Sequence, residues 1–286
     1  MFKRLVAAVD QSAVSRALVE AVGHMALLGT REVLLLHCVT INDLTSISLS
    51  YTLEYLDRNL KELKTELSRH GIDVKTRIVP GSPRSEIFHV AINEGYGVIV
   101  VGAKKHAAAE PLFGGLAFDL IHQAPKPVLI VRLKEDAPAP ANLTRHVLLP
   151  TDFSENAAQA GEAVLTLIKQ GAARRVTLLH VQDQSRIGKA LQDKLGEYNA
   201  IDGQRLDGLK RKLEAEGAEV DTLIRFGSPS VETLKTIQEL SVTLVVMGSQ
   251  GRGFVPELFL GSVSHNVARH GDASVLLIPA KKHLVP

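Results

Sequence analysis

The sequence predicts an α/β protein made of two tandem doubly wound domains, each built on a five-stranded parallel sheet. Short apolar runs rich in Val, Ile and Leu alternate with longer amphipathic stretches, which is typical of strands buried on both faces and separated by helices. The same runs also occur twice, in the same order, which indicates a duplicated unit. Right-handed crossovers would then make each sheet parallel and cover both of its faces.

The duplication extends along the whole chain. Its offset ranges from 142 residues, between Leu5 and Val147, to 147 residues, between Val128 and Val275. The matched segments are 5–10 with 147–152, 33–39 with 176–181, 81–83 with 227–229, 98–102 with 243–248, and 128–131 with 275–278. We therefore expect one domain over residues 1–133 and a second over 145–281.

Segments between these runs carry helix and linker signals. Leucines recur every three or four positions between Leu53 and Leu67, as on one face of a helix, and Gly71 follows as a stop. Ser82-Pro83 and Ser228-Pro229 have the order of an N-cap serine before a proline at the first helical position. Residues 134–144 are rich in Pro, Ala and charge, which suits a linker.

Composition narrows the class of protein. The 286 residues are 45% hydrophobic and carry a formal net charge of +2, which argues against a dedicated nucleic-acid binder. Cys38 is the single cysteine, so an internal disulfide is impossible and a reducing compartment is favoured. No apolar run approaches the roughly 20 residues of a membrane helix. We expect a cytoplasmic protein without a membrane partner.

The informative segment, residues 247–264, follows the predicted fourth strand of the second copy. Gly248 and Gly251 permit a sharp turn that brings backbone N–H groups close to an anion. Gly261 and Ser262 stand where the next helix should begin, and a helix N-terminus favours phosphate. Strands one and four are neighbours in a sheet ordered 3-2-1-4-5, so Asp152 would face this segment across the switch-point crevice.

The spacing of Gly248, Gly251, Gly261 and Ser262 resembles the ATP-binding signature of the universal stress protein family, whose fold is Rossmann-like. The resemblance covers nearly the whole chain. It implies that the segment around Asp152 faces the nucleoside, that the backbone of Val181 meets adenine, and that residues 248–264 hold ribose and phosphates. The implied ATP-binding residues are Pro150, Thr151, Asp152, Phe153, Val181, Met247, Gly248, Gly251, Arg252, Gly261, Ser262, Val263 and Ser264.

Some of these residues have a second interpretation. A tight turn without ligand would also explain Gly248, and a helix N-cap role would explain Asp152. Arg252 is either a phosphate ligand or a solvated surface charge. No G-x-x-x-x-G-K-[ST] or G-x-G-x-x-G pattern is present in the required context.

The first copy departs from the signature at two of four positions. Gly102 and Gly115 keep the spacing, but Lys105 replaces the second glycine and Leu116 replaces the serine. A lysine side chain would crowd the approach of the backbone, and leucine removes a hydroxyl. We expect the first copy not to bind ATP in the same way, although its lysines could attract some anion.

The leading hypothesis is a regulatory ATP-binding protein of the stress response, with Mg²⁺ on the phosphates and at most slow hydrolysis. No residue is identified as catalytic, and no paired Cys/His spacing predicts a metal site of the protein itself. One alternative is an ATP hydrolase or nucleotidyl transferase of related fold. Another is a scaffold whose first domain takes an apolar ligand. The two domains are expected to pair as a pseudo-dimer, and a homodimer of two chains is left open.

Overall fold

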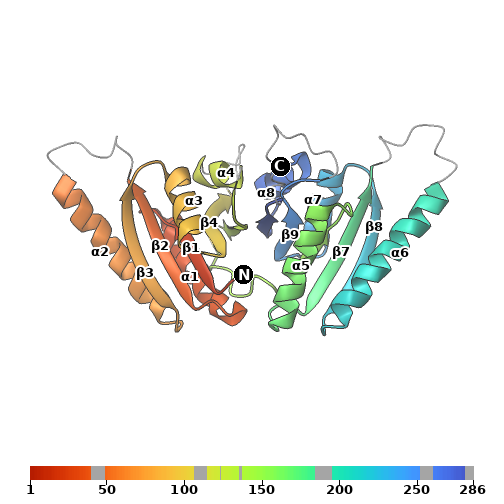
Figure 1. The fold of residues 1–286 in the computed structure, drawn as a ribbon, viewed down its shortest axis with the longest axis horizontal. Coiled ribbons are helices and arrows are strands. Elements are labelled where there is room, and N and C mark those ends of the chain that lie inside the picture. Colours follow the sequence, from red (N-terminus) through yellow and green to blue (C-terminus); the bar gives the residue numbers. More distant parts are fainter. Residues whose placement is uncertain are drawn as a thin grey trace. The chain divides into compact units, whose positions relative to one another are not determined.

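The computed structural model describes residues 1–39, 49–105, 115–122, 124–134, 137–183, 195–251 and 260–280. The chain divides into two compact units, Met1–Ala141 and Asn142–Pro286. Figure 1 shows the first unit in red to yellow-green and the second in green to blue. Arg252 lies outside the described residues, so its predicted phosphate role stays a prediction.

The described part of the first unit is a parallel sheet covered by helices (Figure 1). Its strands are β1 (Arg4–Ala8), β2 (Glu32–Val39), β3 (Asp73–Pro80), β4 (Val98–Lys105) and β5 (Val128–Lys134). Its helices are α1 (Ala13–Gly23), the 3-10 helix η1 (His24–Leu28), α2 (Leu49–Ser68), α3 (Pro83–Asn93) and α4 (Gly115–Ile121). The strand order β3-β2-β1-β4-β5 confirms the predicted doubly wound topology.

The second unit repeats this order in its described residues. Its strands are β6 (Val147–Pro150), β7 (Arg175–Gln182), β8 (Glu219–Phe226), β9 (Leu244–Gly248) and β10 (Ser274–Ile278), in the order β8-β7-β6-β9-β10. Its helices are α5 (Glu155–Lys169), α6 (Leu195–Glu214), α7 (Pro229–Glu239) and α8 (Ser262–His270). All these neighbours pair in parallel, so the carboxyl ends of the strands lie at one edge.

The apolar runs are the core of each sheet. Every residue of β9 and of β10 is buried, as expected for strands covered on both faces. The leucine stripe of α2 faces the sheet at Leu56, Leu60, Leu63 and Leu67, which are at most 6% exposed, whereas Leu53 is 38% exposed. Gly71 has a left-handed φ of 75° just past α2, which is the predicted helix stop.

Proline fixes the start of the third helix in both units. Ser82 and Ser228 are the N-cap residues, and Pro83 and Pro229 follow in the first turn. Neither serine side chain makes a capping hydrogen bond. The N-cap positions are therefore as predicted, but the preset φ of proline, rather than the serine hydroxyl, favours the helix there.

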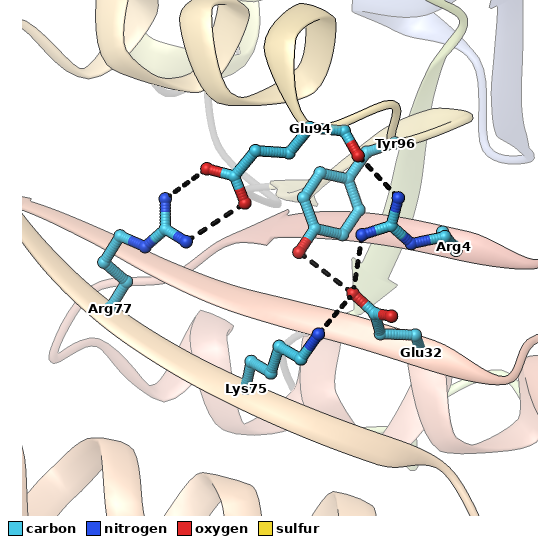
Figure 2. A network of polar contacts seen from close by, with 6 residues as sticks. All are labelled: Arg4, Glu32, Lys75, Arg77, Glu94 and Tyr96. Carbon is cyan, nitrogen blue, oxygen red and sulfur yellow. Dashed lines mark hydrogen bonds and ion pairs between the residues drawn. The ribbon is translucent and has the colours of Figure 1, made fainter.

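A polar network ties together the amino ends of the strands in the first unit (Figure 2). Oε1 of Glu32 accepts hydrogen bonds from Arg4 at 2.9 Å and Tyr96 at 3.1 Å, and lies 3.2 Å from Nζ of Lys75. The hydrogen bond from Arg4, followed by those from Lys75 and Tyr96, lowers the pKa of Glu32 to about 2. The remaining members are Arg77 and Glu94, which form a two-pronged ion pair. This network lies at the edge opposite the strand ends where the predicted crevice opens.

Among the described residues, no helix has the length and apolar character needed to span a membrane.

Candidate functional site

The predicted crevice lies where β6 and β9 end side by side in the second unit. Val147 pairs with Leu244 and Leu148 with Val245, and β7 flanks β6 on the other side. The strand order therefore reverses direction between β6 and β9, which is the switch point of the sheet. The chain leaving β6 and the chain leaving β9 both start from this edge.

Residues 151–154 form a tight turn between β6 and α5. Phe153 has a φ of 60°, a conformation that is rare for a bulky residue. The Phe153 N–H donates to Oγ1 of Thr151 at 3.0 Å, and the Ser154 N–H donates to Oδ1 of Asp152 at 3.0 Å. Ser154 is the N-cap of α5, with its hydroxyl accepting from the Ala157 N–H at 3.2 Å. The helix cap is thus Ser154, and the Asp152 carboxylate closes the turn that precedes it.

Asn156, in the first turn of α5, links this turn to the end of β9. Its side chain is 7% exposed. Oδ1 accepts from the Gln250 N–H at 2.9 Å, and Nδ2 donates to the Ile278 carbonyl at 3.1 Å. A Cβ on Gly248 would lie 2.6 Å from the same Oδ1, so only glycine fits there. Sequence reasoning missed Asn156; its signal is a polar residue where the first copy has Val14.

Gly251 brings the loop after β9 directly against Asp152. A Cβ at this position would lie 2.7 Å from Oδ2 of Asp152, closer than real Cβ contacts allow. A side chain at this position would therefore force the Asp152 carboxylate or residue 251 to shift. The structure brings Asp152 and Gly251 together, as the strand order predicts.

The start of α8 lies over the end of β9. Gly261 is the N-cap, and its N–H donates to the Ser249 carbonyl at 2.7 Å. Ser262, the first helical residue, is exposed, and N–H groups in a first turn have no acceptor within their helix. Ser264 is 3% exposed, and its hydroxyl donates to the Gly248 carbonyl at 2.9 Å. Its donor therefore holds α8 against β9.

The remaining candidates surround this centre. Thr151 and Met247 are 8% and 6% exposed. Pro150, Phe153, Val181 and Val263 are half-buried. Val181 lies near the end of β7, one residue after His180, whose Nδ1 is 2.8 Å from the Thr151 carbonyl.

The first unit is built differently at the corresponding edge. There β4 continues past Gly102 to Lys105 and stays paired with β5 through Lys134, whereas β9 stops at Gly248. A Cβ on Gly102 would lie 2.7 Å from Cγ1 of Val14, so valine fills the place of Asn156. The chain is directed along the sheet instead of folding back over the strand ends.

Asp10, the counterpart of Asp152, is held by its own turn. Its Oδ1 accepts from the Ser12 N–H at 2.8 Å and from the hydroxyls of Ser12 and Ser15 at 2.5 and 2.8 Å. Burial alone would raise the pKa of Asp10, but these hydrogen bonds outweigh it and lower the pKa below its ordinary value. Oδ1 of this carboxylate is thus occupied by groups of its own turn.

Known proteins share both the fold and the duplication. A universal stress protein of Methanocaldococcus jannaschii is 31% identical over 156 residues, which is 48% of this chain and 96% of the relative. One from Mycolicibacterium smegmatis is 27% identical over 217 residues, covering 73% of this chain and 70% of the relative. The crystal structure of a universal stress protein from Archaeoglobus fulgidus superposes with a TM-score of 0.79 at 24% identity, covering 97% of this chain and 98% of its own, and shows the same fold.

The family model for universal stress proteins matches the chain twice, over residues 1–132 and 144–279. These matches cover nearly all of both units. The chain therefore belongs to the universal stress protein family and has its tandem, two-domain form.

Proposed function

We propose that the second unit binds ATP and that the first unit does not, so that the chain is a regulatory nucleotide-binding protein of the stress response. The observation that carries the proposal is the close approach of Gly251 to the Asp152 carboxylate, beside the switch point of the sheet. Nucleotides bind at such points in open α/β sheets. Occupancy would then shift the protein between conformations or partners.

The chemistry around that contact suits a nucleoside triphosphate. Asp152 offers a carboxylate oxygen as an acceptor for ribose hydroxyls, since such groups donate hydrogen bonds. The start of α8 offers the N–H groups of Ser262 and Val263 and the positive end of a helix dipole. The half-buried Val181 would supply backbone groups for the base. These features support a polyanion at α8 and a nucleoside toward β6 and β7.

Mg²⁺ fits this site as an ion coordinated by the phosphates of the nucleotide rather than by side chains of the protein. Within the described residues, no group of three or more His, Cys, Asp or Glu side chains is arranged to hold a metal ion. Mg²⁺ commonly keeps several waters and takes the rest of its ligands from substrate phosphates. In the proposal the ion neutralises phosphate charge, while the residues of this chain bind and orient the nucleotide, and no turnover is needed. We also propose a cytoplasmic location, because the single Cys38 suits a reducing compartment.

The proposal is tested by isothermal titration calorimetry with ATP and Mg²⁺. Gly261→Val with Ser262→Ala places bulk at the N-cap of α8 and removes its exposed hydroxyl, so we expect ATP binding to fall below detection. The matched control is Gly115→Val with Leu116→Ala in the first unit, which should leave the affinity unchanged. Absence of binding heat in the unmodified protein would refute the proposal.

A further inference from the structure

His180 lies against the turn that carries Asp152. Its side chain is 9% exposed. Nδ1 is 2.8 Å from the Thr151 carbonyl oxygen, and the ring centroid is 4.7 Å from that of Phe153. The histidine thus contacts both Thr151 and Phe153 of the turn, and Phe153 is the residue with the unusual positive φ.

Asp202, on α6, faces the other ring nitrogen of His180. Its Oδ2 lies 3.2 Å from Nε2 of His180 and accepts from Nε2 of Gln182 at 3.0 Å. Arg205, one turn further along α6, donates to Oδ1 of Asp202 at 3.4 Å, and its guanidinium carbon is 5.3 Å from the centre of the Phe153 ring. The contacts form a closed circuit from Thr151 through His180, Asp202 and Arg205 back to Phe153.

Both nitrogens of His180 face oxygen acceptors, a backbone carbonyl and a carboxylate. The Asp202 side chain is only 15% exposed, so its contact with the ring is largely shielded from water. Together the two contacts fix the orientation of the His180 ring between the turn and α6.

The first unit keeps the histidine without the carboxylate. Nδ1 of His37 is 2.9 Å from the Val9 carbonyl, as in the second unit. Asp202 is the eighth residue of the 20-residue α6, and the eighth residue of the 20-residue α2 is Leu56, which is 3% exposed. Gln11 stands in place of Phe153. The circuit is thus specific to the unit for which we propose ATP binding.

We propose that Asp202 is a positioning residue, which acts through His180 to hold residues 151–153 in the conformation that presents Asp152 to a ligand. The part of this inference that concerns ATP rests on the proposed function. The part that concerns the turn does not, since those contacts join residues of this chain alone. The position of helix α6 would thereby be coupled to the conformation of residues 151–153.

The first test uses the nucleotide-free full chain. Asp202→Leu copies Leu56, and Asp207→Leu makes the same change at an exposed position of the same helix. We expect Asp202→Leu to raise amide exchange at Phe153 and Ser154 about tenfold, equivalent to about 1.4 kcal/mol, while Asp207→Leu leaves it unchanged. Unchanged exchange in Asp202→Leu, or an equal rise in Asp207→Leu, would overturn the inference.

The second test measures ATP affinity. Asp202→Leu should weaken ATP binding about tenfold, and Asp202→Asn, which keeps an acceptor for Nε2–H, should restore most of that loss. If the unmodified chain binds no ATP but the exchange result holds, the proposed function fails and the positioning role stands. If ATP binds equally well to the unmodified chain and to Asp202→Leu, the link from α6 to the site is refuted.

Discussion

The two units have one fold and two different strand ends. In the first, β4 runs on to Lys105 beside β5; in the second, β9 stops at Gly248 and Asn156 holds the Gln250 N–H of the departing loop. Their cores are equivalent runs of buried Val, Ile and Leu. The apolar pattern therefore determines the fold. A few residues beyond the strand ends decide whether the predicted crevice can form at that edge of the sheet.

Among exchanges between the units, the largest effect on ATP affinity should come from replacing Gly251 of the second unit with the lysine that the first unit has at the corresponding position. Gly251→Lys copies Lys105 and places a Cβ 2.7 Å from Oδ2 of Asp152. Overpacking of this kind costs up to about 3 kcal/mol, so ATP affinity should fall about a hundredfold in calorimetric titration. Lys105→Gly is the matched control and should leave binding as it is. Equal loss in both variants would mean that the units are not distinguished by this position.

A smaller effect should follow from exchanging Asn156, which packs against Gly248, with its counterpart Val14, which packs against Gly102. Asn156→Val copies Val14 and removes the hydrogen bond between Asn156 and the part-buried Gln250 N–H, which should cost about 1 kcal/mol. Urea denaturation followed by circular dichroism should show this loss in the transition of the second unit. Val14→Asn places an amide against Gly102, where its neighbours include Leu18 and Leu133, and should destabilise the first unit. A neutral Asn156→Val would contradict the role given to this side chain.

Acid should affect the two units in different pH ranges. In the second unit His146 occupies the place of Arg4, and burial lowers its pKa below the usual 6.5. The unfolded chain then takes up a proton before the folded one, so stability is lost as pH falls from about 6.5 through the lowered pKa. In the first unit the pKa of Glu32 is about 2 instead of 4.5, so its contribution persists at pH 5 and is lost as pH falls from 4.5 toward 2.

Hydrogen exchange read by mass spectrometry checks this order. As pH is lowered, and after correction for intrinsic exchange rates, peptides of β6 should lose protection before peptides of β1. Glu32→Gln should reduce the loss of stability of the first unit below pH 4.5, leaving the contributions of Asp10 and Glu94, whose pKa values are also lowered. Loss of protection in both units over the same range would show that these two groups do not set their acid sensitivity.

The fold could be predicted because its signals are local and repeated. The runs around Val33 and Val176, and the leucine stripe of α2, have periods that only strands and helices satisfy. Right-handed crossovers then indicated a parallel sheet covered on both faces, and the strand order expected was the usual one for such doubly wound folds. The meeting of Asp152 with Gly251 was likewise predictable, since both follow neighbouring strands.

Contacts between distant side chains could not be predicted in the same way. Asn156 and Gly248 are far apart in sequence, and nothing in the local pattern of α5 marks that asparagine as a partner of the β9 loop. Asp202 is one of several acidic residues on α6, and only the packing of α6 on β7 shows that it faces His180. The buried hydroxyl of Ser264 is a further case: its sequence position suggests a ligand contact, and the fold gives it the Gly248 carbonyl.

Native mass spectrometry of the full chain, titrated with ATP and Mg²⁺, addresses the difference between the units most directly. We expect a single nucleotide per chain at saturation, and about a hundredfold more ATP to reach the same occupancy in the Gly251→Lys variant. Two nucleotides per chain, or a titration unchanged by Gly251→Lys, would contradict this difference between the units.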